Sequence, residues 1–192
     1  GIPGFRLPKD IVEREIDYIR KLGVKFEYGQ IIGRTIPFEK IRQEYDAIFI
    51  GIGAGAPRFM GIPGSNLNNI YSASEFLTRV NLLRANEFPK FDTPVRIASK
   101  VAVIGAGNVS MDAARTARRL GAKEVMIIYR RSETEMPARL EEYHHAIQEG
   151  ISFHWLTQPV EYIGDINNNV KKVRCIKMEL GAPDESGRRR PI

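Results

Sequence analysis

The segment Gly105-Ala106-Gly107-Asn108-Val109-Ser110 has the glycine spacing of a loop that binds the phosphates of a dinucleotide. It follows an apolar run at 100–104 and opens a helical pattern, which is the context that such a loop needs. Gly105 permits the sharp turn, and Gly107 lets a pyrophosphate approach the backbone N–H groups at the positive end of the helix. Ser110 stands where the motif has Gly or Ala, and it is small enough for close helix–strand packing. A tight turn without a ligand is the alternative, and the context favours dinucleotide binding.

Two adjacent arginines, Arg130 and Arg131, follow the next apolar run at 125–129. A site for NAD has an acidic residue at this point, because a carboxylate holds the ribose 2′-hydroxyl. Guanidinium groups instead suit a 2′-phosphate, since their planar forks pair with its oxygens. The sequence therefore favours NADP over NAD, and two surface arginines are the alternative.

A second glycine-rich segment, residues 51–55, has the spacing G-x-G-x-G directly after an apolar run at 46–50. Pro57 follows it and discourages the helix that a pyrophosphate would need. Two interpretations stay open for this segment: a purely structural turn, or a backbone turn that lies beside a flat cofactor.

Candidates for catalysis and metal binding are weaker than these loops. His144 and His145 lie on a charged helical pattern with no carboxylate or thiol at metal-ligand spacing. Serine, histidine and acidic residues occur without the context of a nucleophile elbow. We therefore assign no catalytic residue and no metal ligand. This fits hydride transfer, in which the cofactors carry the chemistry.

The elements that must position these loops alternate between helices and strands along the chain. In the first half we expect helices opened by Pro8 and ended by Gly23, at 37–43 and at 71–85, and strands at 24–28 and 46–50. In the second half we expect strands at 100–104 and 125–129, helices at 107–120 and 132–150, and short antiparallel strands after 151 with a turn at 165–169. Val109, Ala113 and Ala117 are expected to face the sheet. Residues 86–99 have few periodic apolar residues, so we expect a domain boundary there.

The composition is that of an ordinary globular protein, with 192 residues, 43% hydrophobic and 27% charged. This balance excludes a disordered chain and a fibrous repeat. The single cysteine, Cys175, excludes an intrachain disulfide and the four-thiolate cage of an iron–sulfur cluster. No apolar run approaches ~18 residues, so we expect no membrane-spanning helix and a cytoplasmic protein.

The charge balance suits an anionic partner, because 29 basic and 23 acidic residues give a net charge of +6. The basic pairs and triplets lie far apart with acidic residues between them, so we expect no nucleic-acid partner. The chain opens on Gly1-Ile2-Pro3-Gly4 without an initiator methionine, and we expect it to be a segment of a longer protein.

Six segments in this order resemble the small (β) subunit of bacterial glutamate synthase and its relatives. The relatives include the amino-terminal half of dihydropyrimidine dehydrogenase and the flavin subunit of bifurcating ferredoxin–NADP transhydrogenases. The matching segments are GIPGFRLPKDIV (1–12), YDAIFIGIGAGAPRFMGIPG (45–64), SASEFLTRVNLLRA (72–85), VAVIGAGNVSMDAARTARRLGA (101–122), YRRSETEMPAR (129–139) and KMELGAPDESGRRRP (177–191).

The resemblance implies an α/β fold of Rossmann-like nucleotide-binding domains, of the two-dinucleotide-binding type of glutathione-reductase-like flavoproteins, in truncated form. Members of the family have an FAD domain with an NADPH domain inserted into it. Residues 1–97 then correspond to part of the FAD domain, without its own G-x-G-x-x-G. Residues 98–192 correspond to the NADPH domain without its final strand.

Contacts with FAD are implied at four positions of the first part. Arg6 matches a residue that contacts the FAD phosphate or ribose. Ile32 matches one whose backbone meets the adenine, and Gly53 and Gly55 match the turn beside the flavin. The FAD site of this chain is therefore expected to be incomplete.

Contacts with NADPH are implied in the second part of the chain. Ala106, Gly107, Asn108 and Val109 match the phosphate-binding loop, which agrees with the glycine spacing described above. Three arginines match the family positions that bind the 2′-phosphate, namely Arg130, Arg131 and Arg139.

The function implied by the resemblance is electron transfer from NADPH to FAD, and then through iron–sulfur clusters to a partner. For glutamate synthase the partner is the large subunit, which forms glutamate from 2-oxoglutarate and glutamine-derived ammonia. No cluster is expected within this segment, and the isolated segment is expected to be inactive. The alternatives are the flavin subunit of a ferredoxin–NADP transhydrogenase or sulfide dehydrogenase, and a non-catalytic NADP(H)-binding module.

Overall fold

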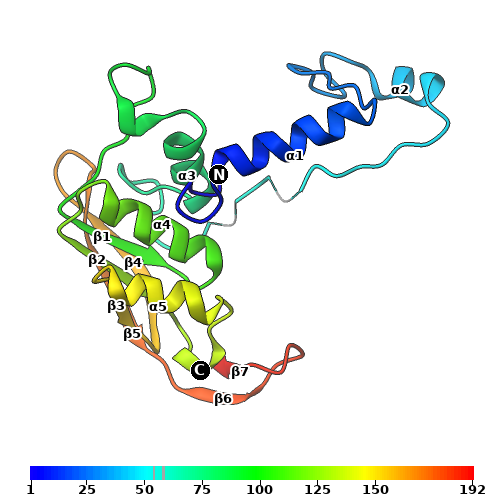
Figure 1. Cartoon of the computed structure of the whole chain (residues 1–192). Coiled ribbons are helices and arrows are strands. Elements are labelled where there is room, and N and C mark those ends of the chain that lie inside the picture. The colour runs from blue at the N-terminus through cyan, green and yellow to red at the C-terminus, as the bar shows by residue number, and fades with distance from the viewer. Residues whose placement is uncertain (54, 58) are drawn as a thin grey trace. The chain divides into compact units, whose positions relative to one another are not determined.

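The computed structural model describes residues 1–53, 55–57 and 59–192 (Figure 1). It contains two compact units. One comprises Gly1–Arg6 together with Arg58–Ile192, and the other comprises Leu7–Pro57. The predicted division between residues 97 and 98 separates an FAD domain from an NADPH domain and does not refer to compact units. It stays a prediction.

The Leu7–Pro57 unit contains two helices, α1 (Lys9–Lys21) and α2 (Phe38–Glu44). Each is preceded by a proline in the N-cap position, where the missing N–H is tolerated. The chain leaves α1 through Gly23, whose φ of +90° favours glycine, as predicted. None of the described side chains of this unit is buried.

The strands predicted at 24–28 and 46–50 are absent, so this prediction was wrong. A parallel strand needs neighbours that accept its hydrogen bonds and cover its faces. The described part of this unit offers only an isolated bridge between Ile32 and Ile36. The 46–50 run therefore stays irregular, and the Phe49 side chain is 94% exposed.

The larger unit is built on a parallel sheet of three strands in the order β1 (Lys100–Ile104), β2 (Glu124–Ile128), β3 (Ser152–His154). Helices α4 (Asn108–Arg119) and α5 (Leu140–Gln148) form the two crossovers. This confirms the predicted alternation of strands and helices after residue 100. Ile104 is in register with Ile128, so the loops after β1 and β2 leave the same edge of the sheet.

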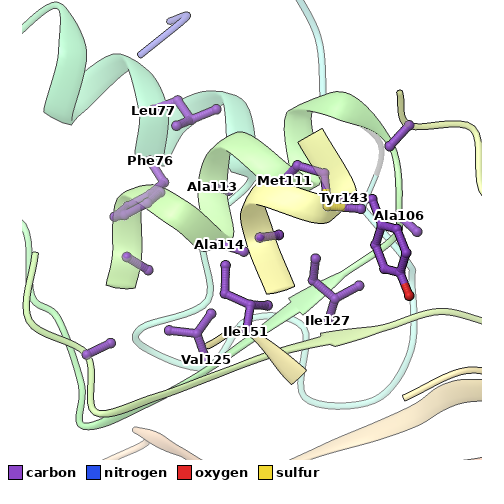
Figure 2. Packing of buried hydrophobic residues seen from close by; sticks show 14 of the residues in the cluster. Phe76, Leu77, Ala106, Met111, Ala113, Ala114, Val125, Ile127, Tyr143 and Ile151 are labelled. Atoms are coloured by element: carbon purple, nitrogen blue, oxygen red, sulfur yellow. The ribbon is translucent and has the colours of Figure 1, made fainter. Parts of the chain in front are cut away.

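The core of this unit lies between α4 and the sheet, where Met111 and Ala114 of α4 face Val125 and Ile127 of β2 (Figure 2). Small alanine side chains let the helix approach the strands closely, and Met111 and Ile127 are fully buried.

Helix α3 (Ala73–Asn81) packs on α4 and adds Phe76 and Leu77 to the same core. Of the three residues predicted to face the sheet, Ala113 and Ala117 are buried, but Val109 is 52% exposed. Val109 lies in the first turn of α4, at the carboxyl end of β1 rather than over the strands.

Two predicted helices are shorter in the structure. α3 begins after Ser72, whose hydroxyl accepts a hydrogen bond from the Glu75 amide at 3.1 Å, and a separate 3₁₀ turn η1 (Ala85–Glu87) follows it. The helix predicted at 132–150 is reduced to the 3₁₀ turn η2 (Glu133–Glu135) and α5. Pro137 lies between these two elements and cannot continue a helix.

The chain ends in two antiparallel hairpins, β4 (Thr157–Gly164) with β5 (Val170–Lys177) and β6 (Leu180–Pro183) with β7 (Arg189–Pro191). In the first hairpin the Asp165 carboxylate accepts hydrogen bonds from the amides of Asn167 and Asn169, both at 2.9 Å, which confirms the predicted turn. The second hairpin is drawn in orange to red in Figure 1 and lies in the same unit as the sheet.

Candidate functional site

The loop between β1 and α4 has the backbone that the glycine spacing predicts. Gly105 has a φ of +113° and donates from its N–H to the carbonyl oxygen of Ile128 at 2.9 Å. A Cβ at Gly105 would stand 3.1 Å from Ser110 Oγ. Backbone conformation and packing together therefore require glycine at position 105.

Gly107 differs from Gly105 in both backbone conformation and surroundings. It is the N-cap of α4 with φ −87° and ψ 174°, which any residue adopts, and a Cβ there would meet no atom of the described chain within 4 Å. No side chain caps the helix at this position, and the Ser110 amide donates to the Gly107 carbonyl oxygen at 3.0 Å, so the amides of Asn108 and Val109 are the ones directed out of the helix end. The open space above Gly107 fits a phosphate group that approaches those amides closely.

The neighbouring loop residues differ in exposure. Ala106 is buried, whereas Asn108 is half-buried and its side-chain oxygen accepts a hydrogen bond from the backbone N–H of Arg139 at 3.0 Å. Arg139 is the N-cap of α5 and its side chain is exposed. The structure therefore places the Arg139 backbone beside the loop between β1 and α4, and the contact of its side chain with a 2′-phosphate stays a prediction.

Arg130 and Arg131 leave β2 at the same edge of the sheet, but they differ sharply. Arg130 is exposed, whereas the Arg131 side chain is 8% exposed. Arg131 donates from Nη2 to the Asp184 carboxylate at 2.5 Å and from Nε to the carbonyl oxygen of Arg189 at 2.8 Å. Arg130 is therefore open to a ligand, and Arg131 is engaged with the β6–β7 hairpin.

Asp184 organises the turn of that hairpin. Its second carboxylate oxygen accepts hydrogen bonds from the Ser186 hydroxyl at 2.5 Å, the Ser186 amide at 2.9 Å and the Arg188 amide at 3.3 Å. The Ser186 hydroxyl, more than the charge of Arg131, lowers the pKa of Asp184 below its usual value. The carboxylate is thus ionised at neutral pH and joins the hairpin to Arg131.

Glu135 is a buried carboxylate at this edge, whereas Asp184 is half-buried. Glu135 accepts a short hydrogen bond from the Ser132 hydroxyl and one from Arg189 Nε at 2.5 Å. These two bonds, the Ser132 hydroxyl first, lower the pKa of Glu135. Its carbonyl oxygen also accepts a bond from the Tyr129 hydroxyl at 3.1 Å, so the segment after β2 is fixed at three points.

Arg6 belongs to the same unit as the sheet. Its side chain bonds a residue of α4 and not the loop between β1 and α4. Its Nη1 donates to the Asp112 carboxylate at 2.5 Å, and this bond raises the pKa of Arg6. Asp112 is almost fully buried, and its other oxygen has no hydrogen-bond partner within the described part of the chain. The predicted contact of Arg6 with FAD stays a prediction, with Nη1 already engaged.

The other predicted FAD contacts, Ile32, Gly53 and Gly55, belong to the Leu7–Pro57 unit. Ile32 is exposed, and Gly53 has a φ of +68° with no atom of the described residues within 4 Å of an added Cβ. Ala54, between the two glycines, lies outside the described residues. Their contact with a flavin stays a prediction.

Four residues of the site were not predicted: Asp112, Glu135, Asp184 and Arg189. Each of them bonds a residue at least 53 positions away in the sequence. Local sequence patterns do not indicate such distant pairings. One signal was available, because the acidic Asp112 stands among the apolar positions of a helix that faces a core.

Other kinds of site find little support. The described residues include no group of three or more His, Cys, Asp or Glu side chains that could hold a metal ion. No helix among them is both long and apolar enough to cross a membrane.

The family model described as "Pyridine nucleotide-disulphide oxidoreductase" matches residues 8–181 of this chain. The full chain is 41% identical to part of the NADP(+)-dependent formate dehydrogenase subunit beta of Moorella thermoacetica and covers 26% of that protein. It is 37% identical to part of the NADPH-Fe(3+) oxidoreductase subunit beta of Geobacter sulfurreducens and covers 28% of it. It is 38% identical to part of the glutamate synthase [NADPH] small chain of Halomonas elongata and covers 40% of it.

Proposed function

This chain belongs to the pyridine nucleotide-disulphide oxidoreductase family, and on that premise we propose that it binds NADPH at the carboxyl edge of the β1–β2–β3 sheet. The observation that carries the proposal is the open N-terminus of α4 at Gly107, beside the arginine-rich segment after β2. A family match alone would allow NAD as well as NADP. The exposed Arg130 at the position of the ribose contact favours NADP.

The residues of this chain have distinct tasks in the proposed site. The first-turn amides of α4 bind the pyrophosphate, and Gly107 keeps the space above them open. Asn108 holds the N-terminus of α5 in place, so that Arg139 and Arg130 flank the ribose phosphate. NADPH, when bound, supplies a hydride for transfer to FAD.

We extend the proposal to a longer protein, because the chain spans between about a quarter and two fifths of the length of the relatives described above. That protein is a subunit like the glutamate synthase small subunit, passing electrons from NADPH to FAD and through iron–sulfur clusters to a partner subunit. Residues 1–97 contribute part of its FAD domain, with Arg6, Ile32, Gly53 and Gly55 as cofactor contacts, and residues 98–192 contribute its NADPH domain. The partner is the glutamate synthase large subunit or another electron-accepting subunit.

Another acceptor enzyme is the second candidate, and a specific observation favours it. Relatives whose names refer to formate dehydrogenase and Fe(3+) oxidoreductase subunits match this chain at 41% and 37% identity, on either side of the 38% for a glutamate synthase subunit. The segment is therefore common to subunits with different acceptors. Identifying the subunit that copurifies with the full-length protein distinguishes these candidates.

The variant Gly107→Val in the full-length protein tests the nucleotide site. A branched side chain fills the space above the first-turn amides, so NADP⁺ and NAD⁺ should both bind roughly tenfold or more weakly, about 1.4 kcal/mol. The backbone of Gly107 is ordinary, so the melting temperature should stay near that of the wild type. Unchanged affinity for both nucleotides in calorimetric titration would refute the site.

The non-catalytic alternative is tested in the same preparation. A module that only senses NADP(H) binds the nucleotide but does not oxidise NADPH when an artificial one-electron acceptor such as ferricyanide is present. The proposed function requires NADPH oxidation with bound flavin, and Gly107→Val should reduce kcat/KM while flavin content stays constant.

A further inference from the structure

The β6–β7 hairpin brings an unpredicted arginine to the edge where the 2′-phosphate is expected. Arg189 lies 58 positions after Arg131, and its carbonyl oxygen accepts a hydrogen bond from Arg131 Nε at 2.8 Å. Its own Nε donates to Glu135 at 2.5 Å, and Glu135 is fixed by the Ser132 hydroxyl. Both ends of Arg189 are thus joined to the segment that follows β2.

Arg189 also has the exposure of a ligand-binding group. Its side chain is 48% exposed, whereas that of Arg131 is 8% exposed. A guanidinium has five N–H donors, and Arg189 uses only Nε in the described part of the chain. Its terminal Nη groups are therefore free for an incoming anion, while Arg131 has one Nη committed to Asp184.

We infer that Arg189 is a specificity-determining residue, which contacts the 2′-phosphate of NADPH together with Arg130, and that Glu135 is the positioning residue that orients it. The inference rests on the proposed function and names a residue for its nucleotide choice. Arg131 then acts mainly as a structural link, because its side chain is buried and holds the hairpin through Asp184.

The physical basis is preorganisation of a charged group. A carboxylate on Nε fixes the plane of the guanidinium, so its Nη donors face one direction without losing rotamer freedom when the phosphate binds. Glu135 is buried, and its lowered pKa keeps it charged near neutral pH. The ion pair therefore persists under the conditions in which NADPH binds.

The same strand supplies a matched control. Strand β7 begins at Arg189, and successive side chains of a strand point to opposite faces, so Arg190 points away from the face that carries Arg189. Arg188 donates from Nε to the Ser186 hydroxyl at 2.9 Å, and Arg188 and Arg190 line a hollow together with Asp184, Glu185 and Ser186. Arg190 carries the same charge as Arg189 and lies in the same hairpin, but it lines the hollow and forms no bond with Glu135 among the described residues.

The test is a calorimetric titration of the full-length protein with NADP⁺ and NAD⁺. For Arg189→Gln we expect the Kd for NADP⁺ to rise roughly tenfold, which corresponds to about 1.4 kcal/mol, and the Kd for NAD⁺ to stay the same. Arg190→Gln should leave both constants unchanged. Added salt should weaken NADP⁺ binding less in Arg189→Gln than in the wild type, because one charge contact is gone.

Variants of Arg189 and Glu135 distinguish a direct contact with the phosphate from a purely structural role of Arg189. Arg189→Gln leaves Glu135 without its cation, and if that variant does not fold, Arg189→Lys keeps the charge without the planar fork and should lose part of the NADP⁺ preference. Glu135→Gln should weaken NADP⁺ selectively and by less than Arg189→Gln, and Glu135→Asp should restore part of the loss.

Several results overturn the inference. It is wrong if Arg189→Gln and Arg190→Gln lose NADP⁺ affinity equally, or if Arg189→Gln weakens both nucleotides alike. It is also wrong if Arg189→Lys keeps the full preference of the wild type. A wild-type protein that binds neither nucleotide refutes the proposed function itself, and the inference with it.

Discussion

The two compact units of this chain contain similar apolar patterns but differ in what those patterns bury. In the unit of Gly1–Arg6 and Arg58–Ile192, helices α3, α4 and α5 and a parallel sheet enclose a continuous core. In the Leu7–Pro57 unit, α1 and α2 form where they are expected, yet no described side chain is buried. Helices need only local hydrogen bonds, whereas strands and cores need partners from distant parts of the chain.

Ion pairs show the same contrast. In the larger unit, Arg115 is almost fully buried, bonds Glu142 at 2.6 Å and Glu149 at 3.1 Å, and lies 4.3 Å from the ring centre of Phe5. In the smaller unit, the pair of Arg42 and Glu39 is exposed on both sides. The contacts of Arg115 join α4 to α5, to the residue that follows α5 and to the amino-terminal segment. The pair of Arg42 and Glu39 joins only neighbouring turns of one helix.

The largest effect is expected from Arg115. Arg115→Ala removes the cation of Glu142 and one of the two cations of Glu149, and it should lower the free energy of unfolding by about 3–5 kcal/mol. Arg42→Ala should change it by about 0.5 kcal/mol or less. Urea denaturation of both variants measures the difference. Equal losses would show that the contrast between the units has no energetic counterpart.

The next effect concerns the core. Ile127 is fully buried beneath α4, so Ile127→Ala should cost about 2–5 kcal/mol through lost contacts and a cavity. Phe49→Ala in this 192-residue chain should cost about 0.5 kcal/mol or less, because the ring is almost fully exposed. Thermal denaturation serves as the readout. A large loss at Phe49 would mean that the 46–50 run is packed after all.

A smaller effect is expected from the glycines of the two loops. Gly105→Ala combines a φ of +113° with a close approach to Ser110 Oγ and should cost about 1–3 kcal/mol. Gly53→Ala is strained by its φ of +68° but meets no neighbour among the residues that the structure describes, and it should cost about 1 kcal/mol. Chemical denaturation of the two variants compares them, and a costlier change at Gly53 would contradict the difference in packing.

The smallest effect is a pH dependence in the larger unit. Burial raises the pKa of Glu149, but hydrogen bonds from Arg119 and Arg115 outweigh it, so the folded pKa lies below the usual 4.5. The stabilisation is therefore present above about pH 4.5 and lost as the pH falls through the folded value. Glu149→Gln should cost about 1 kcal/mol at neutral pH and less in acid. A constant difference across that range would contradict the assignment.

Sequence patterns predicted those parts of the fold that depend on near neighbours. The β1 strand, the turn at Gly105 and α4 follow one another within 20 residues, and their positions were predicted closely. Membership of the pyridine nucleotide-disulphide oxidoreductase family agrees with the predicted α/β, Rossmann-like flavoprotein fold. The run at 46–50 looked like a strand because its residues are apolar, but pairing depends on partners that local pattern does not reveal.

The candidate site was predictable to the same extent. The glycine loop and Arg130 could be predicted as site residues because residue type and position along one βαβ unit define such candidates, and their contact with a nucleotide stays a prediction. The engagement of Arg131 by Asp184 was not, because it depends on a hairpin 53 residues downstream that folds back to the edge of the sheet. Charge alone made Arg130 and Arg131 look equivalent, and burial separates them.

The central claim is that this edge of the sheet binds NADP(H) through its 2′-phosphate. The most direct measurement is a titration of the full-length protein with NADP⁺ and NAD⁺, in the wild type and in Arg130→Ala. Two charge-assisted hydrogen bonds predict a preference of the wild type for NADP⁺ of roughly a hundredfold. Arg130→Ala should remove roughly tenfold of that preference and leave NAD⁺ unchanged. Equal affinity of the wild type for both nucleotides, or an equal loss of both in the variant, would contradict the account.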